Sequence, residues 1–303
     1  MRGKVSISTV VFQRSLGDIG ALEAAKDVGA EAVDLSLADQ DFRKEDSVFS
    51  KGEEAVCEYY TKLKKKADEL GIQIGQTHGF NPPVRGEDEE YNTVVVPENS
   101  RLNCMATAIL GAPVCVFHPA GTTANQGASD EFMLNKTFDY IKTVLEYAKQ
   151  YGVKFGLETV GSNYKLNNTI DHFGDFNKYL DIYSRIDAIE EYKGHFTCCV
   201  DSGHTNMAVQ FGMPTVGDVI RKMGKNVGAV HLHDNNGYID QHTIIGRGTI
   251  DWQDVFDALY EVGYTGNYNS ETYFNYKDCD FRIEEARYTV NVIKKLLSRY
   301  SFN

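Results

Sequence analysis

The amino-acid sequence predicts an α/β protein of the (β/α)₈ barrel class, formed as a single domain over residues 1–303. Eight short apolar runs recur along the chain, and the segments between them carry apolar residues at helical spacing. Most of these runs are continuously apolar, as expected for parallel strands that are covered on both faces. Eight alternating strand and helix units are the number that closes a parallel sheet into a barrel.

The first apolar run, 5–12, is interrupted by Ser6 and Ser8 and is followed by Gln13 and Arg14. It is therefore expected to be a strand rather than a secretory signal. Seven similar runs follow it at the intervals that helices would require. The eight expected strands are 5–12, 32–37, 72–78, 114–119, 154–160, 196–204, 227–234 and 266–272.

The intervening segments predict helices, because their apolar residues recur every three or four positions. Several of these segments end in a glycine just before the next strand, which is a common helix stop. No GxGxxG motif follows the first strand, so a doubly wound open sheet is the less favoured fold. The clearest expected helices are 18–29, 59–71, 138–152 and 283–300.

Two connections are too long to be simple turns between a strand and a helix. They cover residues 38–54, after the second expected strand, and 79–96, after the third. Both leave the carboxyl ends of strands, where barrel active sites lie, so they are candidate lids or walls of a substrate site. Solvated surface insertions are the alternative interpretation of both segments.

The composition limits the partners and the compartment. A net charge of −12 disfavours nucleic acid, whose phosphates recruit Lys and Arg. No apolar stretch is long enough to cross a membrane. The six cysteines form no CxxC pair and are expected to be reduced thiols, as in a cytoplasmic protein. The sequence leaves open whether the chain forms a homo-oligomer.

Six residues with metal-binding or acid-base side chains stand at or near the ends of successive expected strands, from the third to the eighth. They are His78, His118, Glu158, Asp201, His231 and Glu271. Consecutive members are 30 to 43 residues apart, about one strand and helix unit of such a barrel. All strands of a parallel barrel end at the same rim, so these side chains are expected to converge there. A single buried histidine is more simply explained as a core residue. Six such acidic or imidazole residues, each near the end of a successive strand, favour a functional site.

Imidazole and carboxylate groups without thiolates suit one divalent ion, such as Mn²⁺, Mg²⁺, Co²⁺, Zn²⁺ or Fe²⁺. Further polar side chains follow the same strand ends, and we expect them to bind additional ions or to orient the ligands. These are His204, His233, Asp234, Asp240 and His242. His172 and His195 lie away from the strand ends and are assigned no role.

Several short motifs give the sequence a resemblance that covers nearly the whole chain. They are FHPAG (117–121), LETVG (157–161), DSGH (201–204), VHLHDNNGYIDQH (230–242), GRGTIDW (246–252) and SET (270–272). With these motifs the sequence resembles the xylose isomerase-like TIM barrel superfamily. That superfamily includes sugar phosphate isomerases and epimerases, and also endonuclease IV-type AP endonucleases.

The two branches imply different metal content. Resemblance to the sugar branch implies that one divalent ion is held by Glu158, Asp201, His231 and Glu271. Resemblance to the endonuclease branch implies a cluster of up to three zinc ions, for which that branch adds further positions. The residues at those positions are His78, His118, His204, Asp240 and His242. Every position is filled, so ligand identity does not separate the branches.

Charge favours the sugar branch. The loop after the third expected strand carries GEDEE at 86–90, whose four consecutive carboxylates would repel DNA phosphates. No basic stripe with interleaved aromatic residues appears in the loops that bear the motifs. We therefore predict a small-molecule carbohydrate as the substrate.

The resulting hypothesis is a metal-dependent isomerase or epimerase of a sugar, a sugar phosphate or a keto-inositol, acting by proton transfer through an enediolate. Glu158 and Glu271 are the expected catalytic pair, and His204 and Arg247 are expected to bind substrate hydroxyls or a phosphate. Three alternatives stay open: an AP endonuclease with a zinc cluster, a keto-inositol dehydratase, and a non-catalytic carbohydrate-binding barrel.

Overall fold

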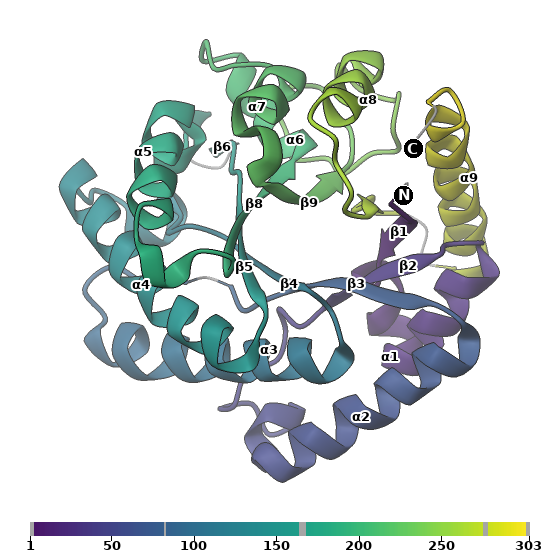
Figure 1. The fold of residues 1–303 in the computed structure, drawn as a ribbon, viewed down its shortest axis with the longest axis horizontal. Helices are drawn as coiled ribbons and strands as arrows, with labels where there is room; N and C mark the ends of the chain where they lie inside the picture. The colour runs from purple at the N-terminus through teal and green to yellow at the C-terminus, as the bar shows by residue number, and fades with distance from the viewer. Residues whose placement is uncertain (1–2, 82, 164–167, 275–277, 301–303) are drawn as a thin grey trace.

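The computed structural model describes residues 3–81, 83–163, 168–274 and 278–300, and its main sheet is a closed barrel of eight parallel strands (Figure 1). The order around the barrel is β1, β10, β9, β8, β5, β4, β3, β2. The barrel strands are β1 Val5–Ser8, β2 Ala32–Ser36, β3 Gln73–His78, β4 Val114–Phe117, β5 Lys154–Glu158, β8 Phe196–Asp201, β9 Val227–Leu232 and β10 Tyr268–Ser270. The predicted fold class is confirmed.

Helices surround the barrel on its outside, as Figure 1 shows. The α-helices are α1 Val10–Asp27, α2 Glu53–Leu70, α3 Val96–Leu110, α4 Asp130–Tyr151, α5 Phe176–Asp187, α6 Ser202–Val209, α7 Val216–Met223, α8 Trp252–Glu261 and α9 Cys279–Leu297. α2, α3 and α4 end at Gly71, Gly111 and Gly152, each with a φ near +70° that favours glycine. The predicted stops at Gly71 and Gly152 are confirmed.

Short elements lie in the connections between the helices and the barrel strands. They are the single turns η1 Val48–Lys51, η2 Tyr91–Val95, η3 Thr122–Asn125, η4 His172–Gly174, η5 Glu190–Tyr192 and η6 Gly224–Asn226, and the antiparallel pair β6 Ser162–Asn163 and β7 Thr169–Ile170. η1 and η2 lie in the two long connections that the sequence marks as candidate walls. The β6–β7 pair, which follows β5, has no counterpart in the prediction.

All eight strands are shorter than predicted, and two of them end early because the chain turns into a helix at the rim. The prediction that 5–12 is all strand is wrong: β1 ends at Ser8, and the backbone N–H groups of Phe12 and Gln13 donate to the Thr9 carbonyl in the first turn of α1. Likewise β8 ends at Asp201, whose carboxylate accepts from the His204 N–H at 2.6 Å and caps α6. An apolar run by itself does not distinguish a strand from the helix turn that continues it.

The main apolar core combines residues of the barrel strands with residues of the surrounding helices. A small separate apolar cluster is formed by Val114, Val116, Cys199 and Ala229 on β4, β8 and β9. Toward the carboxyl ends of the strands the inward side chains become polar and remain fully buried, as Asp34 and His231 do. Such a layer needs internal partners for each polar group.

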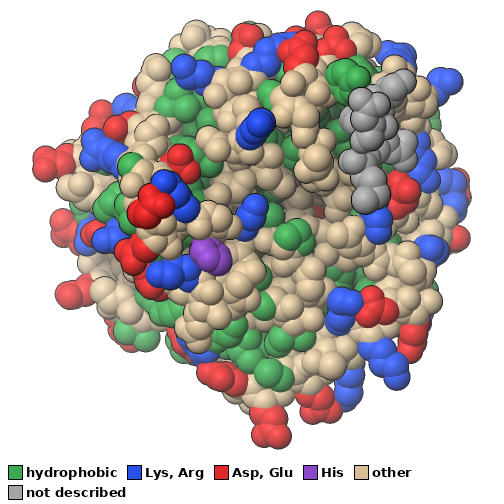
Figure 2. All heavy atoms as spheres, in the orientation of Figure 1, with side chains coloured by type: hydrophobic (Ala, Val, Ile, Leu, Met, Phe, Trp, Pro, Cys, Tyr) green, Lys and Arg blue, Asp and Glu red, His purple; other side chains and the backbone are tan. Residues whose placement is uncertain are grey.

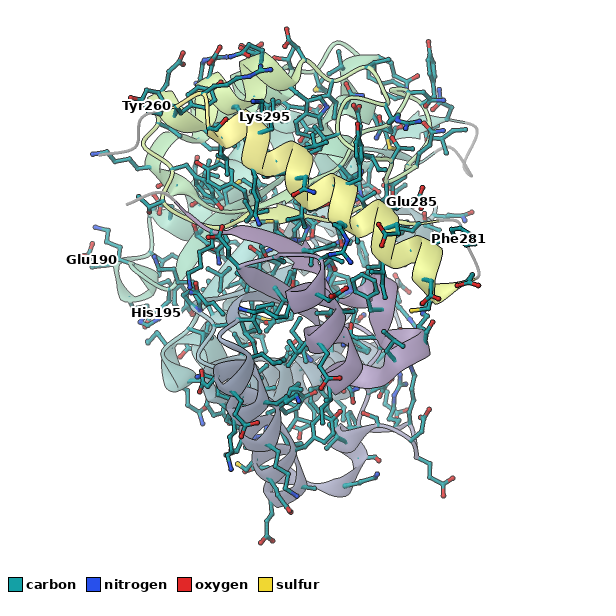
Figure 3. All side chains as sticks on the ribbon, turned by 90° about the vertical axis from the view of Figure 1, so that its right-hand side faces the viewer. Glu190, His195, Tyr260, Phe281, Glu285 and Lys295 are labelled. Carbon is teal, nitrogen blue, oxygen red and sulfur yellow. The ribbon has the colours of Figure 1, made fainter. Side chains whose placement is uncertain are left out.

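The two ends of the barrel can be followed along α9. Figure 3 shows α9 crossing the outside of the barrel, with Phe281 at one end and Lys295 at the other. Phe281 follows β10, so its end marks the rim where the strands finish, while His195 precedes β8 and lies on the opposite side. All six cysteines are unpaired, and no helix among the described residues is long and apolar enough to cross a membrane.

Candidate metal centre

Four acidic and imidazole side chains meet at the centre of the rim. Glu158 ends β5, Asp201 ends β8, His231 lies on β9 and Glu271 directly follows β10. Each offers one ligand atom, and these four atoms all lie within 4.8 Å of one another. Ligand atoms about 2.1 Å from a shared ion stand no more than about 4.2 Å apart, so a small contraction would bring all four onto one ion.

The atoms that face this centre lack ordinary partners. Nδ1 of His231 lies 3.2 Å from Glu271 Oε2 and 3.4 Å from Glu158 Oε1. Nevertheless both carboxylate oxygens of Glu158 and both ring nitrogens of His231 are buried and make no hydrogen bond of good geometry. Buried charged atoms without hydrogen bonds are costly unless a cation binds them. The residues therefore fit a divalent ion.

Two further groups flank the four central residues. On one side, Nε2 of His78 and Nε2 of His118 lie 3.3 and 3.1 Å from Glu158 Oε2. On the other side, Asp240 Oδ2 lies 3.5 Å from His204 Nε2 and 3.2 Å from His242 Nε2. Both groups also have the spacing of metal ligands. The structure thus brings together all nine residues that the sequence singles out for one or more ions.

A buried carboxylate that the sequence analysis does not identify lies behind His231. Asp34, on β2, is fully buried and its Oδ2 lies 3.1 Å from Nε2 of His231. The same oxygen accepts from the side-chain amides of Gln76 at 3.1 Å and Asn269 at 3.2 Å. The available signal is a lone aspartate inside the apolar run of the second strand. A carboxylate behind a ligating imidazole fixes the orientation of its ring.

Asp201 is oriented in a similar way by His233. Nε2 of His233 lies 3.0 Å from both carboxylate oxygens of Asp201. The ring fits there because residue 203 is glycine, where a Cβ would come within 1.9 Å of His233 Cε1. Ser202 adds a second link, since its hydroxyl donates to the His233 carbonyl at 2.7 Å. The glycine of the DSGH motif therefore serves close packing beside Asp201.

Asp234 organises the loop that carries Asp240 and His242. Its carboxylate accepts from the Trp252 side-chain N–H at 2.8 Å and the Gly246 N–H at 2.9 Å. It also accepts from the N–H groups of Asn235 and Ile250. Since it is fully buried and engaged with these donors, Asp234 has a structural role in this loop.

The charges of the cluster reinforce one another. Burial opposes the charge on His78, but the adjacent Glu158 carboxylate outweighs it and raises the pKa of His78 to about 9. Burial lowers the pKa of His242, but the adjacent Asp240 carboxylate outweighs it and raises that pKa to about 9. For Asp201, burial is outweighed by His204 and His233, which lower its pKa to about 2. The Asp201 carboxylate is therefore ionised, and the cationic groups beside it stabilise its charge.

One predicted residue stays apart from the cluster. Arg247 is exposed on the loop before α8 and is not among the described residues that line the cavities at the rim. Burial raises the pKa of the Glu285 carboxyl on α9, and the charge of Arg247 opposes this effect. His204, the other residue expected to bind substrate, lines two adjoining cavities of about 190 and 440 Å³. The position of Arg247 therefore does not support its expected role in substrate binding.

A closed parallel barrel with buried carboxylate and imidazole groups at its carboxyl rim defines the class of this protein, a (β/α)₈ barrel with a candidate metal centre. The family follows from the sequence match. The xylose isomerase-like TIM barrel family matches residues 22–296, and the chain belongs to that family.

Two relatives are similar in sequence to this chain over about 70% of its length. The uncharacterized protein MJ1311 of Methanocaldococcus jannaschii is 29% identical over 224 residues, covering 70% of this chain and 71% of that protein. The D-psicose 3-epimerase of Ruminiclostridium cellulolyticum is 24% identical over 216 residues, covering 68% of this chain and 65% of the enzyme.

Solved structures show the same fold. A D-tagatose 3-epimerase-like protein has a TM-score of 0.74 at 22% identity, with 97% of each chain covered. The D-psicose 3-epimerase of Clostridium cellulolyticum H10, solved with D-tagatose, has a TM-score of 0.72 at 14% identity, with 97% of this chain and 99% of that chain covered. At these identities the likeness establishes the fold alone.

Proposed function

We propose that this protein is a divalent-metal-dependent epimerase of keto sugars, which moves a proton at the carbon beside the ketone. The observation that carries the proposal is the pair of buried carboxylates, Glu158 and Glu271, facing one small cavity from separated strands. The family and the epimerases among the relatives support the same class of reaction.

The metal would be held by Glu158, Asp201, His231 and Glu271, whose converging buried atoms fit it. When bound, a divalent ion supplies Lewis acidity that makes the hydrogen beside a carbonyl easier to remove. Asp34 and His233 would hold His231 and Asp201 in place for this task.

The acid-base work is assigned to Glu158 and Glu271. Around the barrel, β8 and β9 separate β5 from β10 on one side and four strands separate them on the other. The two carboxylates therefore approach the cavity from different directions. Epimerisation requires removal of a proton from one face of a carbon and delivery to the opposite face, through an enediolate of the sugar. Two carboxylates on different sides suit this reaction.

Solvent deuterium exchange tests the proposal. Metal-replete protein is incubated in D₂O with free ketohexoses and keto-inositols, and deuterium at carbon is followed by NMR. We expect exchange with the wild type, and a loss of about 100-fold or more in Glu158→Gln and in Glu271→Gln, measured at saturating metal with bound metal quantified. Glu87→Gln, an exposed acidic position, is the matched control. Full turnover by both site variants would overturn the two-carboxylate mechanism.

A second candidate function is metal-cluster phosphodiester hydrolysis, which the two flanking groups around Glu158 and Asp240 favour. It predicts about three zinc ions per chain and cleavage of an abasic duplex. The exposed carboxylates at 87–90, in the loop after β3, oppose it, because they would repel a DNA backbone. Figure 2 shows the opposite end of the barrel, where the strands begin, and there acidic and basic side chains are interspersed.

Metal analysis separates the two candidates. One ion per chain with no nuclease activity supports the epimerase, whereas three zinc ions with incision of an abasic duplex would replace it.

A further inference from the structure

The cavity above the metal centre continues into a larger one. The metal chamber, the cavity bordered by Glu158 and Glu271, has a volume of about 190 Å³. The outer chamber beside it has a volume of about 440 Å³. The two share four lining residues, and these are Asn81, His118, His204 and Asp240. Small-molecule sites usually enclose roughly 300–1,000 Å³, so the metal chamber alone is small and the two together are of ordinary size.

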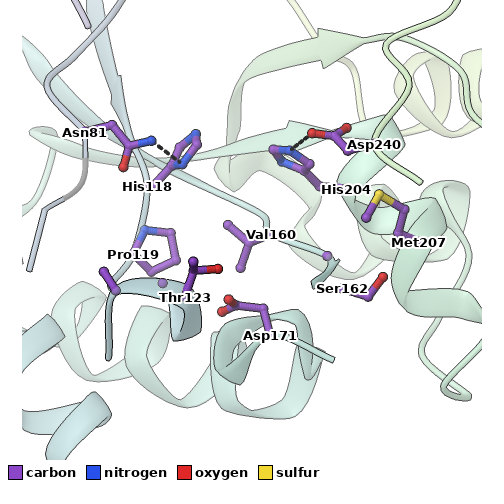
Figure 4. A pocket seen from close by; sticks show the side chains of 13 residues that line it. Asn81, His118, Pro119, Thr123, Val160, Ser162, Asp171, His204, Met207 and Asp240 are labelled. Atoms are coloured by element: carbon purple, nitrogen blue, oxygen red, sulfur yellow. Dashed lines mark hydrogen bonds and ion pairs between the residues drawn. The ribbon is translucent and has the colours of Figure 1, made fainter. Parts of the chain in front are cut away.

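The lining of the outer chamber combines apolar and polar groups. In Figure 4, Val160 has His118 and His204 on one side and the polar residues Asp171 and Ser162 on the other. Asp171 is nine-tenths buried, and its two oxygens each accept one backbone N–H, from Thr122 and Phe173, which leaves further lone pairs. The hydroxyl of Ser162 is buried and makes no hydrogen bond.

The chemistry of this lining suits a second sugar ring. Pro119, Val160 and Met207 offer apolar surface for the C–H face of a ring, while Asp171 and Ser162 offer hydrogen-bonding groups for its hydroxyls. On the basis of the proposed function, we propose that the natural substrate is an uncharged keto-disaccharide, with its keto sugar in the metal chamber and its second sugar in the outer chamber.

The charge of the lining residues argues against a substrate that places a phosphate in the outer chamber. None of the described residues lining either chamber is Lys or Arg, and the outer chamber carries Asp171 and Asp240. A phosphate would lack the cationic partners that it normally requires.

A separate cavity of about 230 Å³ adjoins the metal chamber at Val10 and Tyr273, and it is bordered by Arg14 and Arg282. Arg282 already donates to the Val11 carbonyl at 3.0 Å and to the Ser15 hydroxyl at 2.7 Å. A sugar phosphate directed into this cavity is the competing outcome of the test.

Gly121 provides a selective way to fill the outer chamber. It lines this chamber and not the metal chamber, and a Cβ built on it has no neighbouring atom within 4 Å. Its φ of −88° and ψ of 145° are open to any residue. Gly121→Phe should therefore occupy the chamber without straining the backbone, and Gly121→Ala is the matched control that leaves the chamber open.

The experiment compares three kinds of sugar on the metal-loaded protein. Deuterium exchange is measured for free ketohexoses (fructose, psicose, tagatose), for keto-disaccharides (lactulose, maltulose, isomaltulose) and for fructose 6-phosphate. Binding of the unreactive lactitol and sorbitol is measured by calorimetry. We expect kcat/KM for the best disaccharide to exceed that of the best free ketohexose at least tenfold, and lactitol to bind more tightly than sorbitol.

The variants then assign that advantage to the outer chamber. Gly121→Phe should remove the preference for disaccharides and for lactitol while leaving exchange of free ketohexoses within about twofold of wild type, and Gly121→Ala should keep both. Preference for free ketohexoses or for fructose 6-phosphate, or equal loss for all sugars in Gly121→Phe, would overturn this inference alone. Absence of exchange from every sugar would overturn the proposed function as well.

Discussion

Oδ2 of Asp34 lies 3.1 Å from Nε2 of His231, while Nδ1 of the same ring faces Glu158 and Glu271. A proton on Nε2, beside the Asp34 carboxylate, would leave the lone pair of Nδ1 for the metal centre. We therefore expect Asp34 to favour Nδ1 as the nitrogen that is available to an ion.

Asp34→Asn is expected to weaken divalent metal binding by about 10- to 100-fold, because the amide orients the imidazole less firmly than the carboxylate. Metal affinity is measured by competition with a chromophoric chelator, and folding is checked by circular dichroism. Asp46→Asn, at an exposed position, is the control. Unchanged affinity in Asp34→Asn would show that Asp34 does not act through His231.

Gly203→Ala is expected to destabilise the protein and weaken metal binding, although alanine normally stabilises a helical position by about 1 kcal/mol relative to glycine. The added Cβ would lie 1.9 Å from His233 Cε1 and would push that ring away from Asp201. Gly121→Ala, where the Cβ meets open space, is the control. Urea unfolding decides the sign, and a stabilised Gly203→Ala would contradict the close packing of His233.

Removal of the divalent ion is expected to lower the thermal midpoint. A ligand that binds only the folded state stabilises it by about 2.7 kcal/mol at 100 times its Kd, which for a chain of this size corresponds to roughly 5 °C. The measurement is differential scanning calorimetry with EDTA and after addition of Mn²⁺, Co²⁺ or Zn²⁺. The same midpoint in all samples would argue against an ion bound at Glu158 and its neighbours.

Asp234→Ala is expected to lower the free energy of unfolding by at least about 2 kcal/mol, because several buried N–H donors, including Trp252 Nε1, would lose their acceptor. Asp46→Ala should change it by no more than about 0.5 kcal/mol. Chemical denaturation of both variants provides the comparison. A loss of similar size in the two would mean that Asp234 does not hold the 235–251 loop.

Asp41 is expected to contribute to acid stability. The side-chain hydrogen bonds from Arg43, opposed by burial, lower the pKa of Asp41 from 3.8 to about 2. Because the folded-state pKa lies below the unfolded value, this stabilisation is present above about pH 4 and is lost as the pH falls toward 2. Arg43 is 42% exposed, so solvent screening limits the contribution to about 1 kcal/mol.

Asp41→Asn tests this contribution through the pH dependence of urea unfolding. Wild type should be more stable than the variant near pH 6, and the difference should shrink between pH 4 and pH 2. A difference that stays constant across this range would assign the effect to packing instead of charge.

Much of the site could be predicted because its residues repeat with the fold. His78, Glu158, Asp201 and His231 each end or lie near the end of a barrel strand, and parallel strands that alternate with helices must end at one rim. The limits of the strands were less predictable, since apolar residues such as Phe12 serve equally well in a strand or in a helix that packs on the barrel.

Roles that depend on contacts between distant segments were not predictable. In the sequence, Asp34 is an isolated acidic residue in an expected strand. Arg247 is a candidate for substrate binding because it lies within the GRGTIDW motif. Their positions differ because Asp34 points into the barrel beside His231, whereas Arg247 lies on the exposed loop before α8.

The barrel class and the set of acidic and imidazole residues at its rim follow from the sequence alone, because periodic patterns of apolar and polar residues are local properties of the chain. The folded structure was needed to learn which of these groups face one another, which carboxylate lies behind His231, and that the metal chamber adjoins a larger one beside Gly121. Those relationships depend on distances of a few ångströms between strands, which are fixed by packing and register and are not encoded in any single segment.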